Sequence, residues 1–205
     1  MDETAWLAEL RPLLPGAVDV NIQQSIRSTI NEFYSNTAVY TLEYPPINVV
    51  TGVSRYALPD IAEGKILYLL RAKFNGAPIS VVSTGVEANG VGTPTRIWLE
   101  PDPMELVINS SPASDLLGGL EVEVSLVPLT VANSTIPDSA GVVYYQHILD
   151  GALGRMYKQP SKPWTNQSLS TYHLKRFRIG MAKATELNRK GLSSADSSWK
   201  FPMWA

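Results

Sequence analysis

The chain of 205 residues contains no cysteine, so it forms no disulfide, has no thiolate nucleophile and offers no cysteine ligand to zinc. No apolar run approaches the ~18 residues of a membrane-spanning helix, so we expect no span. The N-terminal stretch MDETAWLAEL is acidic and lacks the basic start and apolar run of a signal peptide. These absences predict a protein made and kept in a reducing, soluble compartment, or released from one by lysis.

Catalytic motifs are also missing. His147 and His173 do not form HExxH spacing and have no second pair beside them, so we interpret them as structural rather than as metal ligands. The glycine-rich stretch 85–94 matches neither GxGxxG nor a P-loop and predicts a hairpin loop. No G-x-S-x-G elbow occurs, and nothing singles out two strand carboxylates as a glycosidase pair. We therefore expect no enzymatic activity, no cofactor and no metal.

Charge is unevenly distributed. Residues 1–150 have a net charge of −10 (7 basic minus 17 acidic), whereas residues 151–205 have +8 (10 basic minus 2 acidic). This split indicates either contact of the C-terminal part with nucleic acid or packing between surfaces of opposite charge. A solvated helix face is the alternative. No helix-turn-helix, zinc-finger or RNP pattern is present, so sequence-specific DNA recognition is not expected.

Helical periodicity marks both ends of the chain. It predicts a short helix over 4–14, a helix over 20–34 capped by Asp19, and a helix from Val142 that ends before Pro160. A further helix over 166–190 follows and completes an αα-hairpin. The third helix has apolar residues at one face: Val142, Tyr145, Ile148, Leu149, Ala152, Leu153 and Met156.

Between residues 38 and 130 the period changes to two, which is typical of strands. We expect Pro45-Pro46 to end the first strand and Asn75-Gly76 to form a tight hairpin. The predicted strands are 38–44, 49–57 (one strand, or a pair of short ones interrupted by Gly52), 65–74, 77–84, 96–100, 105–109 and 120–127. Their short spacing favours an antiparallel sandwich or barrel.

The predicted architecture is α+β. A helical bundle, formed by 1–37 and 131–192, is interrupted by an antiparallel β-sandwich or barrel-like insertion over 38–130, and 193–205 is an extended tail. Exposed aromatic residues on a tail favour docking, either on the chain's own bundle or on a partner. The docking residues are Trp199, Phe201, Met203 and Trp204, and the predicted basic contact surface consists of Arg155, Lys158, Lys162, Lys175, Arg176, Arg178 and Lys183.

The order of several short motifs resembles the head-to-tail adaptor (connector) proteins of tailed phages, in particular the tail tubular protein A type of short-tailed phages. The motifs, which extend over nearly the whole chain, are Leu58-Pro59-Asp60, Asn75-Gly76-Ala77-Pro78, Gly92-Thr93-Pro94 before Trp98, Leu126-Val127-Pro128, Ile136-Pro137-Asp138, the stretch from His147 to Leu153, and Lys162-Pro163-Trp164. None has catalytic meaning, and the family supplies no functional residue to transfer.

The resemblance implies a structural virion protein of the tail or neck, present in the host cytoplasm during assembly. It implies a dodecameric ring between the portal protein and the tail nozzle, tail tube or tail fibres. Such a ring extends the channel through which DNA is ejected, with transient non-specific DNA contact. The alternative is a binding module in which Trp98, Tyr56 and Tyr68 of the insertion stack on a glycan or receptor; burial of these aromatics in the sheet would argue against it.

Overall fold

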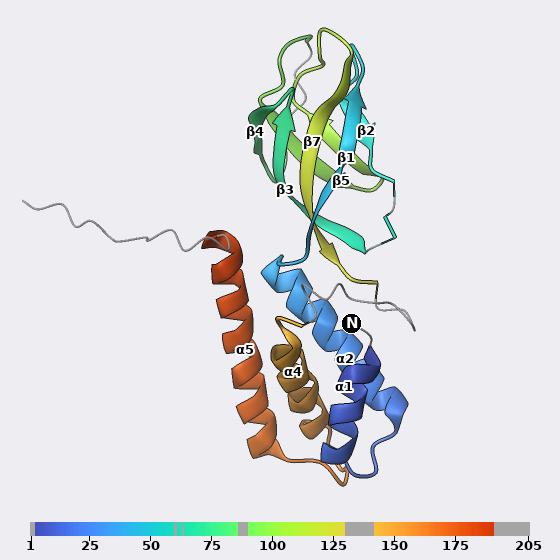
Figure 1. The fold of residues 1–205 in the computed structure, drawn as a ribbon, viewed down its shortest axis with the longest axis vertical. Coiled ribbons are helices and arrows are strands. Elements are labelled where there is room, and N and C mark those ends of the chain that lie inside the picture. Colours follow the sequence, from blue (N-terminus) through green and yellow to red (C-terminus); the bar gives the residue numbers. More distant parts are fainter. Residues whose placement is uncertain (1–2, 60, 63, 86–89, 130–141, 191–205) are drawn as a thin grey trace, which may run out of the picture.

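The computed structural model describes residues 3–59, 61–62, 64–85, 90–129 and 142–190. Within these ranges the chain is a mixed α+β protein. Helices from both ends of the chain lie together at one end of the molecule, and a seven-stranded, nearly closed sheet lies at the other (Figure 1). The α+β class and the helix–sheet–helix order expected from the sequence are confirmed. The exact residue boundaries of the two parts stay a prediction.

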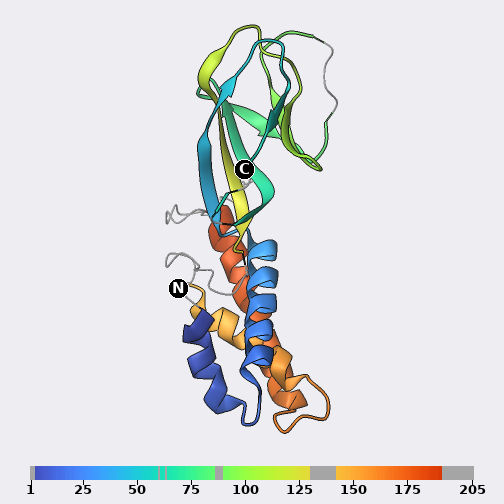
Figure 2. The same cartoon turned by 90° about the vertical axis from the view of Figure 1, so that its right-hand side faces the viewer.

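The described helices are α1 (Glu3–Leu10), a 3-10 turn η1 (Arg11–Leu13), α2 (Asp19–Thr37), α4 (Tyr145–Tyr157) and α5 (Gln167–Lys190). α4 packs against α1, α2 and α5, and α2 also contacts α5. Figure 2 shows α2 and α5 running along the length of this part of the molecule. Helices α1 and α5, which lie nearest the two ends of the described chain, therefore both pack against α2 and α4.

Helix α1 is fixed to α4 by an aromatic pair. Trp6 is fully buried and stacks on Tyr145 with ring centroids 5.4 Å apart. The indole Nε1 donates a hydrogen bond to the Tyr145 carbonyl oxygen at 3.2 Å, and the Tyr145 hydroxyl donates one to the Ala5 carbonyl oxygen at 3.1 Å. These bonds satisfy the polar ends of the buried Trp6 ring and the partly buried Tyr145 ring, so the first helix has one defined position on α4.

Two helix starts differ from the sequence prediction. Val18, not Asp19, occupies the N-cap position of α2, and no side-chain cap bond forms. Asp19 is instead the first helical residue and forms an ion pair with Arg11, eight residues earlier. Helix α4 begins at Tyr145, and Val142, which was expected on its buried face, is 57% exposed. Asp138 and Ser139, either of which has the side-chain chemistry to cap the start of that helix, lie outside the described residues.

The strands are β1 (Thr41–Val49), β2 (Arg55–Ala57), β3 (Lys65–Phe74), β4 (Ala77–Val81), β5 (Arg96–Pro101), β6 (Met104–Ile108) and β7 (Leu116–Val127). Their order is β1-β7-β3-β4-β5-β6-β2. Asn75 and Gly76, both with positive φ, form the two-residue hairpin predicted between β3 and β4. β4 and β5 pair in parallel, so the prediction of an entirely antiparallel sheet is wrong at this pair.

The prediction that Pro45-Pro46 ends the first strand is wrong. β1 continues to Val49, and its register with β7 gains one residue between Tyr44 and Ile47, where the prolines lie. β1 pairs with β7 alone, so a bulge on this outer strand accommodates residues that have no N–H to donate. The expected strand over 49–57 is correspondingly shorter, because only Arg55–Ala57 pairs with β6.

Helix α5 is hydrogen-bonded to the point where α2 meets the sheet. α2 ends at Ala38, which adopts the left-handed conformation with φ 51° and turns the chain toward β1. The side-chain nitrogen of Asn188 donates to the carbonyl oxygens of Thr37 and Ala38, at 3.2 and 2.9 Å. Because these carbonyls lie past the last intrahelical bonds of α2, Asn188 supplies partners that the helix itself does not provide.

Candidate assembly surface on helices α4 and α5

The inner side of α5 is a narrow seam of small and aromatic residues. Ser170, Phe177 and Ala184 recur every seven residues and are buried. Ser170 and Phe177 contact α4, the principal neighbour of α5. The Ser170 hydroxyl donates to the Gly154 carbonyl oxygen at 2.8 Å, which joins the start of α5 to the last turns of α4. This seam determines which side of α5 is left for other contacts.

Three glycines allow the helices of this seam to approach closely. A Cβ atom at Gly151 would lie 2.4 Å from Cγ2 of Thr29 on α2 and 2.8 Å from Cδ2 of Phe177 on α5. At Gly154 it would lie 2.7 Å from Cγ of Leu174, and at Gly180 2.4 Å from Cγ of His147. All four distances are shorter than a carbon–carbon contact, so each position admits only hydrogen.

A buried carboxylate connects α4 to α5. Asp150 is 1% exposed, and its Oδ1 lies 2.8 Å from Nδ1 of His173. Its Oδ2 forms an ion pair with Nε of Arg176 at 3.1 Å, although not with hydrogen-bond geometry. Arg176 also donates to the Tyr172 hydroxyl at 3.1 Å and lies over the Tyr172 ring. The bond to Tyr172 and the charge of Asp150 raise the pKa of Arg176 above its ordinary value.

Two residues of the predicted basic surface thus have acidic partners within the chain. Arg176 pairs with Asp150, and Arg155 of α4 forms an ion pair with Glu32 of α2. Both pairs hold helices together, which the sequence did not reveal. The other five residues have no acidic partner within ion-pair distance among the described residues: Lys158, Lys162, Lys175, Arg178 and Lys183.

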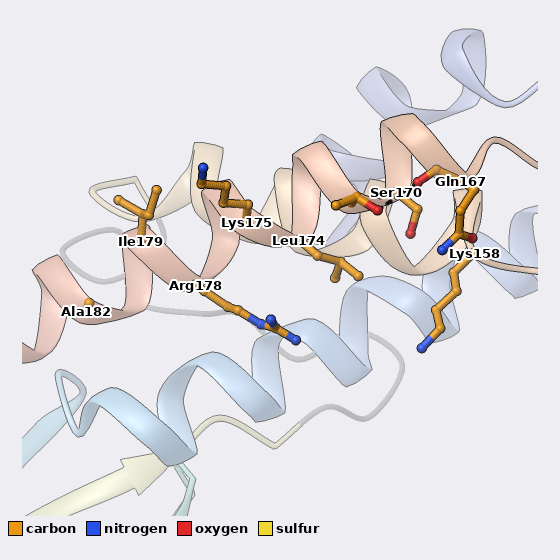
Figure 3. A pocket seen from close by; sticks show the side chains of 9 residues that line it. Lys158, Gln167, Ser170, Leu174, Lys175, Arg178, Ile179 and Ala182 are labelled. Atoms are coloured by element: carbon orange, nitrogen blue, oxygen red, sulfur yellow. Dashed lines mark hydrogen bonds between the residues drawn. The ribbon is translucent and has the colours of Figure 1, made fainter.

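A groove lies along one flank of α5, between this helix and the end of α4 (Figure 3). It has a volume of about 570 Å³, and Lys158, Lys175 and Arg178 line it together with Leu174 and Ile179. Lys158, Leu174 and Arg178 also line the adjoining space of about 500 Å³, which reaches Arg155 and Gln159. A smaller hollow beyond these two residues reaches the polar face of α2. No carboxylate is among the lining residues.

The outward side of α5 carries large apolar side chains in contact with solvent. Leu169, Tyr172, Ile179 and Leu187 lie on one stripe of the helix, with Tyr172 54% and Leu187 48% exposed. A helix buried along one seam needs only about three apolar positions per two turns, so these additional residues are not required by the fold. They make the outer face of α5 a candidate contact surface.

The remaining predicted site residues are placed as follows. The proposed docking residues Trp199, Phe201, Met203 and Trp204 lie outside the described residues. Both histidines pack between helices: His173 pairs with Asp150, and His147 lies against Gly180, where burial lowers the pKa of its imidazole. Across the described part of the chain, no group of three or more potential metal-ligating side chains gathers.

The aromatic residues considered for glycan stacking are mostly in the core. Trp98 and Tyr56 are buried, and the Tyr56 hydroxyl donates to the carbonyl oxygen of Val53 at 2.8 Å. Tyr68 is half exposed. Buried rings have no face free to stack on a sugar, so Tyr56 and Trp98, whose ring lies against Gly85, do not form a binding platform.

Sequence reasoning missed the residues that shape the surface most. Asp150, Gly151 and Gly154 lie in one stretch of α4, and none of them was predicted to have a packing role. A usable signal was present, because two glycines three residues apart inside a helical pattern lower helix propensity and indicate a packing requirement. The partners of these residues, on α2 and α5, could not be identified from spacing.

A comparison of the chain with models of known protein families finds no match, and a comparison with curated proteins finds none either. Among the described helices, none combines the length and apolar character needed to cross a membrane. The function is therefore argued from the surface of α4 and α5.

Proposed function

We propose that the protein is a structural virion protein: a head-to-tail adaptor that forms a ring, of about twelve copies, between the portal and the tail nozzle or fibres. In this proposal α1, α2, α4 and α5 act as one helical bundle that makes the ring and portal contacts. The seven-stranded sheet projects from the bundle, and the ring extends the DNA channel. The aromatic tail residues, from Trp199 to Trp204, dock on the portal.

The observation that carries the proposal is the outer face of α5. Its inner seam is fixed by Asp150, by the bond from Ser170 and by three glycine contacts, while Ile179 and Leu187 face solvent. A ring requires a heterologous contact, in which one patch binds a different patch of the next copy at a constant angle. A rigidly held helix with unpartnered apolar side chains supports such a role.

The charge distribution supports the same arrangement. Lys175 and Lys183 lie beside the apolar stripe and have no acidic partner among the described residues, whereas residues 1–150 carry a net charge of −10. Two copies can therefore approach with unlike charges facing each other, which favours one relative orientation over others. The alternative, a glycan-binding β module, is less well supported, since Trp98 and Tyr56 are buried and only Tyr68 is half exposed.

The proposal is tested by the native mass of the purified protein, measured by light scattering with and without the portal protein of the same virus. We expect a ring on the portal. Replacing Ile179 and Leu187 by Glu should abolish the ring, because two charges would be buried in the subunit contact. Leu117→Glu is the matched control, since Leu117 is 93% exposed on β7 and remote from α5.

Two results would contradict the proposal. A small dimer under all conditions would exclude a ring. Ring formation by the variant with Glu at positions 179 and 187 would show that the outer face of α5 is not the subunit contact. Deletion of 198–205 addresses the tail separately: we expect loss of portal attachment with retained folding, and normal attachment would refute the docking role of Trp199 and Trp204.

A further inference from the structure

The groove beside α5 has an excess of positive charge that nothing in its lining balances. Lys158 comes from the end of α4 and Arg178 from the middle of α5, and both line each of the two larger spaces. Figure 3 shows their side chains extending to the same side of α5, the side on which α2 lies, whereas Lys175 points the other way. Leu174 lies between them and is part of both linings. The groove thus presents two cations on either side of an apolar floor.

Beyond this pair the groove continues over neutral polar side chains. Gln159 lies next, followed by Asn21, Gln24 and Ser28 of α2. Amide side chains both donate and accept hydrogen bonds, so they can pair with the N–H and C=O groups of an extended backbone. Arg155 lies here too, but its charge is already paired with Glu32. The lining therefore offers cations at one end and backbone-compatible groups at the other.

The lining discriminates between possible anionic partners. Among the residues that the structure describes, no aromatic side chain lines the groove, so these residues offer no platform on which the bases of a single strand could stack. A duplex presents its phosphates on a convex surface, which matches a protruding helix better than a hollow between helices. An extended peptide fits a concave groove, and an apolar side chain on Leu174 is buried without losing any hydrogen bond.

We propose that this groove binds an acidic segment of a partner protein, with carboxylates at Lys158 and Arg178 and an apolar side chain on Leu174. The proposal does not depend on the ring, because every group it uses lies within one chain. With two charge pairs open to solvent and one small apolar contact, the affinity is weak, because solvent-exposed ion pairs contribute little free energy. Binding weakens as salt is added, because the charges are screened.

The test uses the full chain and a short fluorescein-labelled peptide in which glutamates flank leucine, followed by fluorescence anisotropy. The control probe has glutamine in place of glutamate. The double variant Lys158→Gln with Arg178→Gln should weaken peptide binding at least tenfold. The matched control, Lys162→Gln with Lys183→Gln, removes the same charge from residues that do not line the groove and should change binding less than twofold.

Each outcome decides the proposal. No binding of the acidic peptide by the unaltered protein up to millimolar concentration overturns it, as does equal binding of the glutamine probe. Equal loss in both double variants shows attraction to net charge alone and also overturns it. Tighter binding of a labelled single-stranded or duplex DNA than of the peptide assigns the groove to nucleic acid instead. Circular dichroism of each variant verifies that α4 and α5 remain folded.

Discussion

Replacing Gly151 by alanine is expected to destabilise the protein although it improves helix propensity. Alanine in place of glycine inside α4 stabilises the helix by about 1 kcal/mol. The added Cβ, however, would lie 2.4 Å from Cγ2 of Thr29 and 2.8 Å from Cδ2 of Phe177. These neighbours lie on different helices and are buried, so α2 and α5 would both have to move away from α4.

Inserting an extra methyl group into a packed core costs about 1–3 kcal/mol, and occasionally more. Two contacts on opposite sides of α4 cost about 3 kcal/mol or more together, so after the propensity gain the net loss is about 2 kcal/mol. In a chain of this size that loss lowers the melting temperature by about 4–8 °C. Thermal unfolding followed by circular dichroism at the helical wavelength measures it.

The variant Thr29→Ser provides the internal control. It removes Cγ2, the atom nearest the new methyl group, but keeps the hydroxyl that donates to the Ser25 carbonyl oxygen at 2.8 Å. The double variant should therefore be more stable than the sum of the single effects by about 1 kcal/mol. If Gly151→Ala is as stable as the unaltered protein, or if the two substitutions are simply additive, the close approach of α2 and α4 is refuted.

Two further substitutions address the titratable groups between the helices. Asp150→Asn keeps the shape of a buried side chain but removes the charge that faces His173 and Arg176. Because Arg176 is partly exposed, we expect the free energy of unfolding, measured in urea, to fall by about 1–2 kcal/mol. An unchanged urea midpoint would contradict the ion pair. Burial lowers the pKa of His147 in the folded state, so its neutral form is favoured there and the unfolded chain takes up the proton first. Its contribution to stability is full above about pH 6.5 and is lost as pH falls from that value through the lowered pKa. His147→Gln should therefore reduce the fall in melting temperature between about pH 7.5 and about pH 5.5. If the melting temperatures of the variant and the unaltered protein change equally with pH, the effect is excluded.

Periodicity in the sequence predicted most elements because it records which face of each segment is buried, whatever covers it. The strand Lys65–Phe74 has the predicted bounds, and α5 starts one residue after the predicted position. The hairpin at Asn75-Gly76 also depends only on local backbone preference, since both residues need positive φ. Such features need no knowledge of distant residues.

Where tertiary contacts override local preference, the sequence prediction was wrong or incomplete. A Pro-Pro pair such as Pro45-Pro46 would end a strand inside a sheet, because proline has no backbone N–H to donate to a neighbouring strand. β1 lies at the end of the strand order, and a bulge at the prolines allows it to continue. Asp19 has the chemistry of an N-cap, but Arg11 lies close enough to bind it. In the first case the absence of a second neighbouring strand in the order of the described strands, and in the second the ion pair with Arg11, determined the local structure.

The sequence by itself determined that this protein is an α+β chain with helices at both ends, a sheet between them and a basic C-terminal part. Only the tertiary structure decided which basic residues are available. Arg155 and Arg176 are paired because α2 and α4 bring Glu32 and Asp150 to them, whereas Lys158 and Arg178 have no carboxylate within ion-pair distance in the described part of the chain. Charge along a chain is fixed by composition, but whether a charge is neutralised depends on which distant side chain the fold places within a few ångströms.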